Sequence, residues 1–283
     1  MTQNVISRFA PSPTGRLHLG HGYSALRAHD LARAAGGRFL LRIEDIDPIR
    51  CRPEHIAGIF EDLRWLGIAW DEEPLFQSAR LPLYAAALDR LRTAALAYPC
   101  FCTRARIAAE IAASASAPHG PDGPIYPGIC RTLSAGDRAA RIAAGEAHAW
   151  RLDISRAAAI AGPLDWHDAR AGTIGATPAI HGDIVLARKD APTSYHLAVT
   201  VDDAAQGITD VVRGQDLFAA THVHRLLQAL LDLPVPRYHH HKLLLDDKGE
   251  RLAKRAGSPT LASMRADGVD ARELVARLRG RPQ

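Results

Sequence analysis

Strand-like and helix-like patterns alternate along residues 5–43, and this alternation limits the possible fold more than any other feature of the chain. Residues 5–9 are apolar enough to form a buried strand, and the proline- and glycine-containing run 11–15 must turn because it cannot continue that strand. A helix pattern follows over 23–35, and a second strand pattern over 38–43. Alternation of this kind predicts a parallel sheet, so the expected class is α/β.

The same order of elements continues and then breaks. Pro53 opens a helix pattern that Gly67 ends, and another helix is predicted over 83–97. Residues 112–130, rich in Ala, Ser, Pro and Gly, are expected to form a long loop, and residues 131–182 an irregular insert. Alternation then resumes, with strands expected over 183–187, 195–201, 210–212 and 243–245, and helices over 217–231 and 270–278.

Composition narrows the class of protein further. An aromatic content of 6% favours a helix-rich α/β domain over an all-β sandwich. No uncharged apolar run approaches the roughly 18 residues that a membrane helix needs, and the first residues lack the basic and apolar regions of a signal peptide. The protein is therefore expected to be cytoplasmic, without contact to membranes. A formal net charge of +4 permits nucleic-acid binding without requiring it.

Residues 11–21 place two histidines where the first predicted helix begins. Free N–H groups and the helix dipole make such a helix start attractive to anions. His18 and His21 can donate hydrogen bonds to phosphate oxygens, and Gly20 lets a flat purine or a phosphate approach the backbone. Isolated histidines are more often structural, but the eleven-residue context directly after the first strand favours a nucleotide site.

A second candidate motif, Gly-Glu-Arg-Leu-Ala-Lys-Arg, occupies residues 249–255. By itself it is better explained as a solvated basic loop. However, lysine is rare in this arginine-rich chain, and the motif keeps one at Lys254. Both motifs follow predicted strands, and a parallel sheet brings the ends of its strands to one crevice where ligands bind. Considered together, the two motifs predict a nucleotide-binding crevice.

The pair of motifs resembles the HIGH and KMSKS signatures of class I aminoacyl-tRNA synthetases. Residues 8–15, 40–47 and 211–217 are similar to the glutamyl branch of that family. The resemblance extends from Arg8 to Arg255, and it implies a Rossmann-type parallel-sheet catalytic domain with an inserted zinc-binding, acceptor-type subdomain. The implied divisions are a first catalytic half (1–99), the insert (100–182), a second catalytic half (183–240), and the KMSKS-like loop with a C-terminal helical segment (241–283).

The length of the chain favours one group within this branch. Only 29 residues follow Lys254, which are too few for the helical anticodon-binding domain of the ordinary glutamyl enzymes. The chain is more similar to stand-alone catalytic domains that activate L-glutamate and attach it to queuosine in the anticodon of tRNA(Asp). This resemblance implies a monomeric ligase that acts on ATP with Mg²⁺, L-glutamate and queuosine-containing tRNA(Asp). Two alternatives stay open: a truncated synthetase that charges a tRNA 3′ end, and a non-catalytic tRNA-binding relative.

Arginine suits a carboxylate ligand because its planar fork matches two oxygens. Arg8 and Arg213, each on or at the end of a predicted strand, are therefore candidates for binding the carboxylates of glutamate. The glutamate-binding set that the resemblance implies is Arg8, Ala10, Ser12, Glu44, Tyr195 and Arg213. Within that set, Glu44 is expected to pair with the substrate ammonium and Tyr195 to hydrogen-bond to it.

The resemblance also implies a mechanism, in which the glutamate α-carboxylate attacks the α-phosphate of ATP in line. The protein then supplies position and positive charge rather than a covalent nucleophile. The implied ATP-binding and catalytic residues are His18, Gly20, His21 and Lys254. Lys254 is expected to stabilise the charge that develops on the phosphates. Arg251 and Ala253 stand where KMSKS has lysine and serine, so a slower turnover is expected.

A cysteine cluster suggests a metal site. Three of the four cysteines lie in one region of the chain: Cys100, Cys102 and Cys130. Three thiolates leave one position open in a tetrahedral zinc site. The resemblance assigns Tyr126 to that position, with one zinc ion per chain, whereas His119 is the chemically more usual candidate. Three buried structural cysteines are the alternative, and Cys51, far from the cluster in sequence, is expected to be structural.

Overall fold

Seven strands form the large sheet of this computed structural model, which describes residues 4–113, 119–121, 123–244 and 259–281. In spatial order they are β3 (Leu75–Phe76), β2 (Arg38–Ile43), β1 (Ile6–Phe9), β11 (Asp210–Gly214), β12 (Arg237–His241), β8 (Asp165–Asp168) and β9 (Gly172–Gly175). Neighbouring strands pair in parallel, except that β8 and β9 form an antiparallel hairpin. Because the chain leaves β1 for β2 on one side and later adds β11 on the other, a ligand crevice is expected beyond the C-terminal end of β1.

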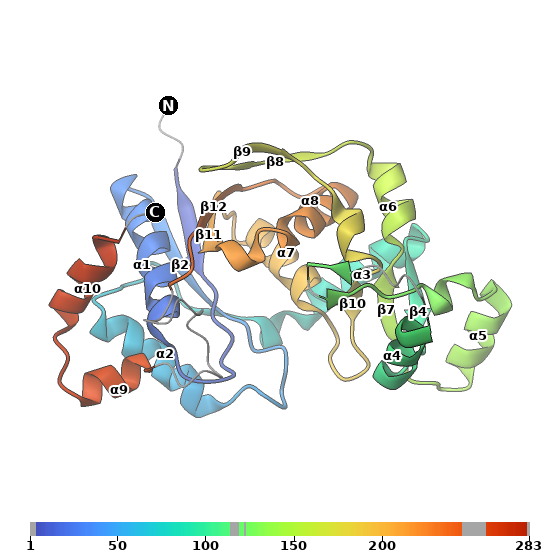
Figure 1. The fold of residues 1–283 in the computed structure, drawn as a ribbon, viewed down its shortest axis with the longest axis horizontal. Coiled ribbons are helices and arrows are strands. Elements are labelled where there is room, and N and C mark those ends of the chain that lie inside the picture. Colours follow the sequence, from blue (N-terminus) through green and yellow to red (C-terminus); the bar gives the residue numbers. More distant parts are fainter. Residues whose placement is uncertain (1–3, 114–118, 122, 245–258, 282–283) are drawn as a thin grey trace.

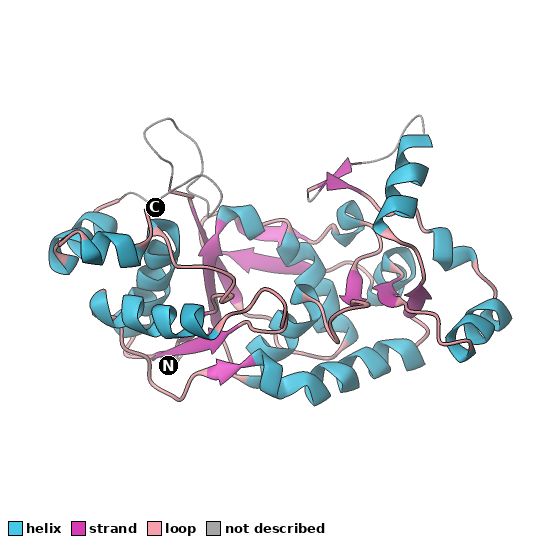
Figure 2. Cartoon of the chain, turned by 90° about the horizontal axis from the view of Figure 1, so that it is seen from below, coloured by secondary structure: helices cyan, strands magenta, loops and turns pink. Residues whose placement is uncertain are grey.

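Helices lie on both sides of the large sheet (Figure 1; Figure 2). They are α1 (Leu19–Ala34), α2 (Pro53–Trp65), α7 (Tyr195–Ala205), α8 (Ala220–Leu230), α9 (Leu261–Ala266) and α10 (Ala271–Arg279), whereas α3 (Leu81–Thr93) packs against α7. The predicted α/β class with a parallel sheet is therefore confirmed. Within the described part of the chain, no helix combines the length and the apolar character that crossing a membrane requires.

A smaller subdomain occupies the other end of the elongated molecule (Figure 1). Its antiparallel sheet has the order β10 (Val185–Ala187), β7 (Ala149–Leu152) and β4 (Ala97–Cys100), and a hairpin joins β5 (His119–Gly120) to β6 (Gly123–Pro124). Its helices are α4 (Arg104–Ala113), α5 (Ala135–Ala143) and α6 (Ile154–Ala161). Short 3₁₀ turns are found at Gln77–Arg80, Ile129–Thr132, Pro178–His181 and Gln215–Leu217.

The strands of the two sheets do not follow the domain boundaries that the sequence implies. The hairpin β8–β9 lies within 100–182, yet it extends the large sheet at its β12 edge. Conversely, β4 begins at Ala97 and β10 at Val185, and both belong to the small sheet. The subdomain is therefore built from two separate stretches of chain that enclose the β8–β9 hairpin.

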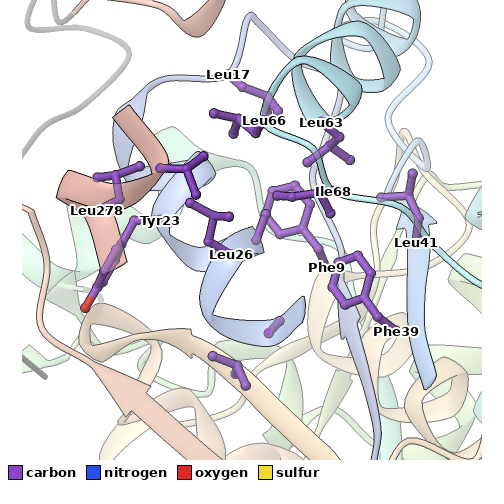
Figure 3. Packing of buried hydrophobic residues seen from close by; sticks show 14 of the residues in the cluster. Phe9, Leu17, Tyr23, Leu26, Phe39, Leu41, Leu63, Leu66, Ile68 and Leu278 are labelled. Carbon is purple, nitrogen blue, oxygen red and sulfur yellow. The ribbon is translucent and has the colours of Figure 1, made fainter. Parts of the chain in front are cut away.

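The main hydrophobic core fixes α1 against β1 and β2. Its larger members include the residues labelled in Figure 3: Phe9, Leu17, Tyr23, Leu26, Phe39, Leu41, Leu63, Leu66, Ile68 and Leu278. The turn between α1 and β2 passes close to the residue before β1, because a Cβ atom at Gly37 would collide with the carbonyl oxygen of Val5. This packing holds the first turn of α1 beside the end of β1, where the crevice lies.

The predicted strand over 195–201 is wrong, because these residues begin α7. The hydroxyl of Ser194 accepts a hydrogen bond from the backbone N–H of Leu197 and so caps the helix. Residues 197–200 are all buried, so their apolar pattern cannot distinguish a helix from a buried strand.

The predicted strand over 243–245 is also wrong where it is described, because the strand of this region is β12. Three consecutive histidines make β12 look too polar for the interior of a sheet. His240 and His241 are nevertheless buried, and they are hydrogen-bonded to Asp168 and Ser24, respectively. Partners that are distant in sequence thus satisfy polar groups on an inner strand.

Two helix ends differ from their predicted positions. α1 begins at Leu19 rather than near residue 23, because the side chain of His18 caps it. The helix predicted over 83–97 ends at Thr93, and Ala95 adopts a φ of 53° before β4 begins. A left-handed residue stops a right-handed helix, so the last predicted turn becomes the start of a strand instead.

Candidate active site

A cavity of about 250 Å³ opens at the C-terminal ends of β1, β2 and β11. It brings together eight of the predicted site residues: Arg8, Ala10, His18, Gly20, His21, Glu44, Tyr195 and Arg213. Ser12 lines an adjoining larger cavity, which shares Glu44 and Tyr195 with the first. Lys254, Arg251 and Ala253 lie outside the described residues.

The start of α1 fixes the orientation of both histidines. The Nδ1 atom of His18 accepts the backbone N–H of Gly20 at 3.1 Å, and the Nδ1 atom of His21 accepts the backbone N–H of His18 at 3.2 Å. A neutral ring whose Nδ1 is an acceptor carries its proton on Nε2. Both rings can therefore donate through Nε2 to an anion, which suits the phosphate role predicted for this motif.

Arg8 points into the cavity from β1, but its charge is already balanced. Its Nε and Nη2 atoms donate to the two carboxylate oxygens of Asp203 at 2.8 and 3.1 Å. Arg42, which is fully buried on β2, donates through Nη1 to the same carboxylate at 2.7 Å. Burial alone would raise the pKa of Asp203, but the charges of Arg8 and then Arg42 lower it to about 2. Asp203 is therefore ionised at neutral pH.

Arg213 has a different environment. Its Nε donates to Nε2 of His240 at 3.1 Å, its Nη1 to Nδ1 of His224 at 3.2 Å, and its Nη2 to the hydroxyl of Thr221 at 2.5 Å. Burial, followed by the charge of Arg213, lowers the pKa of His240 to about 4 and that of His224 well below its usual value. Within the described part of the chain, Arg213 is therefore held by neutral acceptors and by no carboxylate.

Glu44 and Tyr195 lie on the wall between the two cavities. Burial raises the pKa of Glu44, and the charges of Arg42 and Arg8 act in the opposite direction. Burial also raises the pKa of Tyr195, so its phenol stays protonated at neutral pH and is able to donate a hydrogen bond. The pair offers one acidic group and one hydroxyl next to the arginines.

The sequence did not reveal the residues that hold these groups in place. Asp203, His240 and His224 contact the site from α7, β12 and α8, and none of them belongs to a predicted motif. One signal was present: adjacent acids, Asp202 and Asp203, stand in an otherwise apolar run. Buried carboxylates need cationic or hydrogen-bonding partners, so this pair was a signal that such partners exist, although it did not identify them.

The adjoining cavity measures about 920 Å³ and lies between the large sheet and the subdomain. Its charged lining residues are Glu44, Asp47, Arg50, Arg104, Arg151, Arg188, Lys189 and Asp190. Basic groups outnumber acidic ones, and the side chains of Arg50 and Arg188 are also held by Asp47. The cavity extends from Glu44 to Cys102, and its excess of basic over acidic residues suits a polyanionic ligand.

The predicted cysteine cluster is assembled in the subdomain. Cys100, Cys102 and Cys130 are buried, and their sulfur atoms all lie within 4.8 Å of one another. The hydroxyl oxygen of Tyr126 is 3.3 Å from the sulfur of Cys100 and 3.6 Å from that of Cys102. A tetrahedral ion with zinc–sulfur bonds of about 2.3 Å separates its sulfur ligands by roughly 3.8 Å, so the group has the right dimensions for a metal ion.

Other features of the cluster bear on that fit. Burial raises the pKa of Cys102 to about 11. Burial also acts to raise the pKa of Cys130, but hydrogen bonds from the N–H of Phe101 and from the neighbouring thiols and Tyr126 together lower it. His119 begins β5 on the neighbouring hairpin. Cys51 is separate from the cluster, and its sulfur lies 4.0 Å from the carbonyl oxygen of Glu44.

Comparisons with known proteins agree with this geometry. A family model described as tRNA synthetases class I (E and Q), catalytic domain, matches residues 4–281. The Glutamyl-Q tRNA(Asp) synthetase of Rhodobacter capsulatus is 52% identical over 282 residues, which cover 96% of this chain and 99% of that protein. The protein of the same name from Symbiobacterium thermophilum is 45% identical over 97% of this chain and 85% of its own length. The solved glutamate-tRNA synthetase of Elizabethkingia anophelis matches with a TM-score of 0.81 at 27% identity, over 98% of this chain and 61% of that one.

Proposed function

The chain belongs to the class I tRNA synthetases for glutamate and glutamine (E and Q), whose catalytic domain it carries, and from this premise we propose that it attaches ATP-activated glutamate to queuosine in the anticodon of tRNA(Asp). Relatives that are 52% and 45% identical over nearly the whole chain are named for this reaction. The observation that carries the glutamate assignment is Arg213, a buried guanidinium at the cavity without a carboxylate partner among the described residues. Such a group favours a ligand that brings the missing negative charge.

Glutamate has two carboxylates and one ammonium, so the cavity must separate opposite charges. We assign the side-chain carboxylate to Arg213, because a carboxylate held by a full positive charge is a poor nucleophile and is therefore not the reacting one. The ammonium is assigned to Glu44 and Tyr195, which line the same cavity. Arg8, which already shares Asp203 with Arg42, adds a weaker positive charge beside the backbone that follows β1.

The α-carboxylate is then left free to react with ATP. One of its oxygens forms a bond to the α-phosphorus, the bond from that phosphorus to the β-phosphate oxygen breaks, and pyrophosphate leaves. His18 and His21 donate through Nε2 to phosphate oxygens and hold ATP in line. Mg²⁺ accompanies ATP and neutralises part of the phosphate charge.

Lys254 is assigned to the phosphates of ATP. It lies outside the described residues, but the residues that flank its segment support the assignment. Leu244 lines the cavity, and Thr260 forms a β-bridge with His18 at the start of α1. A lysine here stabilises charge on the leaving pyrophosphate.

The second step transfers glutamate to RNA. A ring hydroxyl of queuosine attacks the carbonyl carbon of the mixed anhydride, the bond from that carbon to the phosphate oxygen breaks, AMP leaves, and the hydroxyl proton passes to solvent. The larger cavity supports this step, because it adjoins the glutamate site at Glu44 and Tyr195 and basic residues outnumber acidic ones in its lining. Sequence-specific RNA recognition usually targets single-stranded loops with splayed bases, such as an anticodon loop. The reaction is assigned to the cytoplasm, where ATP and tRNA occur together.

The cysteine cluster is assigned to one structural zinc ion held by Cys100, Cys102, Cys130 and Tyr126. The sulfur separations and the hydroxyl position support this set. Zinc would supply a closed tetrahedral crosslink rather than chemistry. The ion would tie β4 to the turn at Ile129–Thr132 and so stabilise one wall of the larger cavity.

The function is tested by a transfer assay with matched tRNAs. The purified enzyme, ATP and labelled glutamate are incubated with tRNA(Asp) from normal cells and with tRNA(Asp) from cells that cannot make queuosine. We expect label on the first tRNA alone, and none on tRNA(Glu). Glutamate-dependent ATP–pyrophosphate exchange without any tRNA is expected as well.

Each alternative gives a different result. Equal labelling of both tRNA(Asp) samples would refute the queuosine assignment, and labelling of tRNA(Glu) would indicate a synthetase that charges a 3′ end. Absence of pyrophosphate exchange would indicate a non-catalytic RNA-binding protein.

A further inference from the structure

A buried polar chain connects the β8–β9 hairpin to the glutamate cavity. Asp168, at the end of β8, accepts a hydrogen bond from Nδ1 of His240 at 2.8 Å, and Nε2 of His240 accepts one from Nε of Arg213 at 3.1 Å. Asp168, His240 and Arg213 are 1%, 3% and 6% exposed, respectively. The reaction described above does not use Asp168 or His240, although both are polar and buried.

The donors and acceptors of this chain permit one arrangement of protons. An arginine N–H only donates, so Nε2 of His240 must be unprotonated and the ring proton must be on Nδ1, facing Asp168. Asp168 is itself fixed, because its Oδ1 accepts the backbone N–H groups of Arg170 and Ala171 at 2.9 Å each, and its Oδ2 also accepts the backbone N–H of His240. An acceptor-only carboxylate therefore sets the tautomer of the ring that holds Arg213.

The same arrangement leaves the charge of Arg213 available. A carboxylate in direct contact would neutralise the guanidinium, as Asp203 does for Arg8. A neutral imidazole orients the guanidinium without neutralising it, and the negative charge of Asp168 is moved one side chain away. A guanidinium has five N–H groups, and His240, His224 and Thr221 take one each, so two remain for the two oxygens of a carboxylate ligand.

We propose that Asp168 and His240 are positioning residues for amino-acid recognition: Asp168 fixes the tautomer of His240, and His240 aims Arg213 at the side-chain carboxylate of glutamate. This inference rests on the proposed function, because it concerns the same cavity and the same substrate. It adds a role for the β8–β9 hairpin, which extends the large sheet and ends in the turn that carries Asp168.

The second imidazole on Arg213 does not duplicate this role. Nδ1 of His224 accepts from Arg213, so its Nε2 carries the proton and donates to Nδ1 of His196 at 3.2 Å. No carboxylate is described next to His224, whose described partner at Nε2 is a second imidazole rather than an acceptor-only group. Asp168 is thus the group that fixes a single donor and acceptor pattern around Arg213.

Two substitutions at His240 separate positioning from packing. In His240→Gln, the side-chain oxygen takes the place of Nε2, so the acceptor for Arg213 is kept. In His240→Asn, the amide takes the place of Nδ1, so the bond to Asp168 is kept and the acceptor for Arg213 is lost. Both variants remove the ring, so a packing role predicts the same effect for both.

The readout is glutamate-dependent ATP–pyrophosphate exchange, with thermal unfolding as the folding control. We expect His240→Asn to raise the KM for glutamate by about tenfold or more, which is the effect of losing one charge-assisted hydrogen bond. His240→Gln is expected to stay within about threefold of wild type, because its acceptor remains. The KM for ATP should not change in either variant, since His18 and His21 are untouched.

Asp168→Asn tests the tautomer directly and serves if His240→Asn does not fold. Its amide donates towards Nδ1 of His240 and so favours the proton on Nε2, where it opposes the N–H of Arg213. We expect a raised KM for glutamate, whereas Asp165→Asn, an exposed residue of the same strand, should leave it unchanged.

The outcomes separate this inference from the proposed function. If wild type shows no glutamate-dependent exchange, the proposed function fails. If wild type is active but His240→Asn and His240→Gln raise the glutamate KM equally, or Asp168→Asn leaves it unchanged, the positioning inference is overturned while the function stands.

Discussion

Removal of the carboxylate at Asp203 gives the sharpest test of how the site is held together. Asp203 is buried and accepts hydrogen bonds from Arg8 at 2.8 and 3.1 Å and from Arg42 at 2.7 Å. These two arginines lower its pKa from the ordinary 3.8 to about 2, against the effect of burial. A carboxyl group with that difference between unfolded and folded states contributes roughly 2.5 kcal/mol to the free energy of unfolding.

The sign of the pH dependence follows from the lowered pKa. The contribution of Asp203 is fully present above pH 4, and it is lost as the pH falls towards 2, because the unfolded chain takes up the proton first. Asp203→Asn removes the contribution at every pH and leaves Arg8 and Arg42 without their shared anion. At pH 7 we expect the variant to lose about 3–5 kcal/mol of unfolding free energy, as for other broken buried ion pairs.

Urea unfolding of both proteins at pH 7 and pH 3 measures this effect. The difference in unfolding free energy between wild type and Asp203→Asn should be about 1 kcal/mol smaller at pH 3 than at pH 7, because wild type has already lost part of the Asp203 contribution at pH 3. Asp190→Asn is the matched control, since Asp190 forms a two-bond pair with Arg188 but is half exposed. The Asp190→Asn substitution should lower the unfolding free energy by less than about 1 kcal/mol. An Asp203→Asn difference that is the same at both pH values would refute the reasoning.

Three other predictions concern the metal and the phosphates. After dialysis against a chelator, wild type should retain one zinc ion per chain and Cys130→Ser should retain less, because one thiolate is lost; full zinc content in the variant would place the ion elsewhere. Tyr126→Phe should weaken zinc retention and His119→Ala should not, and the reverse result would assign the fourth position to the imidazole. Lys254→Ala should slow glutamate-dependent pyrophosphate exchange by about 100-fold or more with little effect on the KM for glutamate, because its charge acts mainly in the transition state. Lys248→Ala is the control in the same segment, and an equal loss in both variants would count against a specific role for Lys254.

Local patterns in the sequence predicted the elements that carry the site, because their signals lie within a few residues. Proline and glycine after residue 9 mark the end of β1, and the predicted strand over 38–43 coincides with β2. The motif at residues 11–21 likewise lies at the cavity, since a strand, a turn and a helix start are all local features. Periodicity failed at 195–201 because residues 197–200 are all buried, so these positions have no exposed face that would reveal the period.

Contacts between distant residues could not be predicted in this way. Arg8 and Asp203 are 195 positions apart, and His240 and Asp168 are 72 apart. A single sequence contains no information on distance between such positions, so polar residues in β12 and α7 gave no pattern that named their partners. The cysteine cluster was predictable despite a separation of 28 positions between Cys102 and Cys130, because several cysteines in one region of a chain are typical of a metal site.

The two arginines of the cavity show why chemistry at a charged site depends on those distant contacts. Arg8 and Arg213 are the same residue type near the C-terminal ends of neighbouring strands, β1 and β11, and no local pattern in the sequence distinguishes their roles. The structure separates them by their partners: a carboxylate faces Arg8, and neutral imidazoles and a hydroxyl face Arg213. Under the proposed function, the paired Arg8 organises the site and the unneutralised Arg213 binds an anion. We therefore expect recognition of the glutamate side chain to depend on where the fold places Asp203 and on the histidine at position 240.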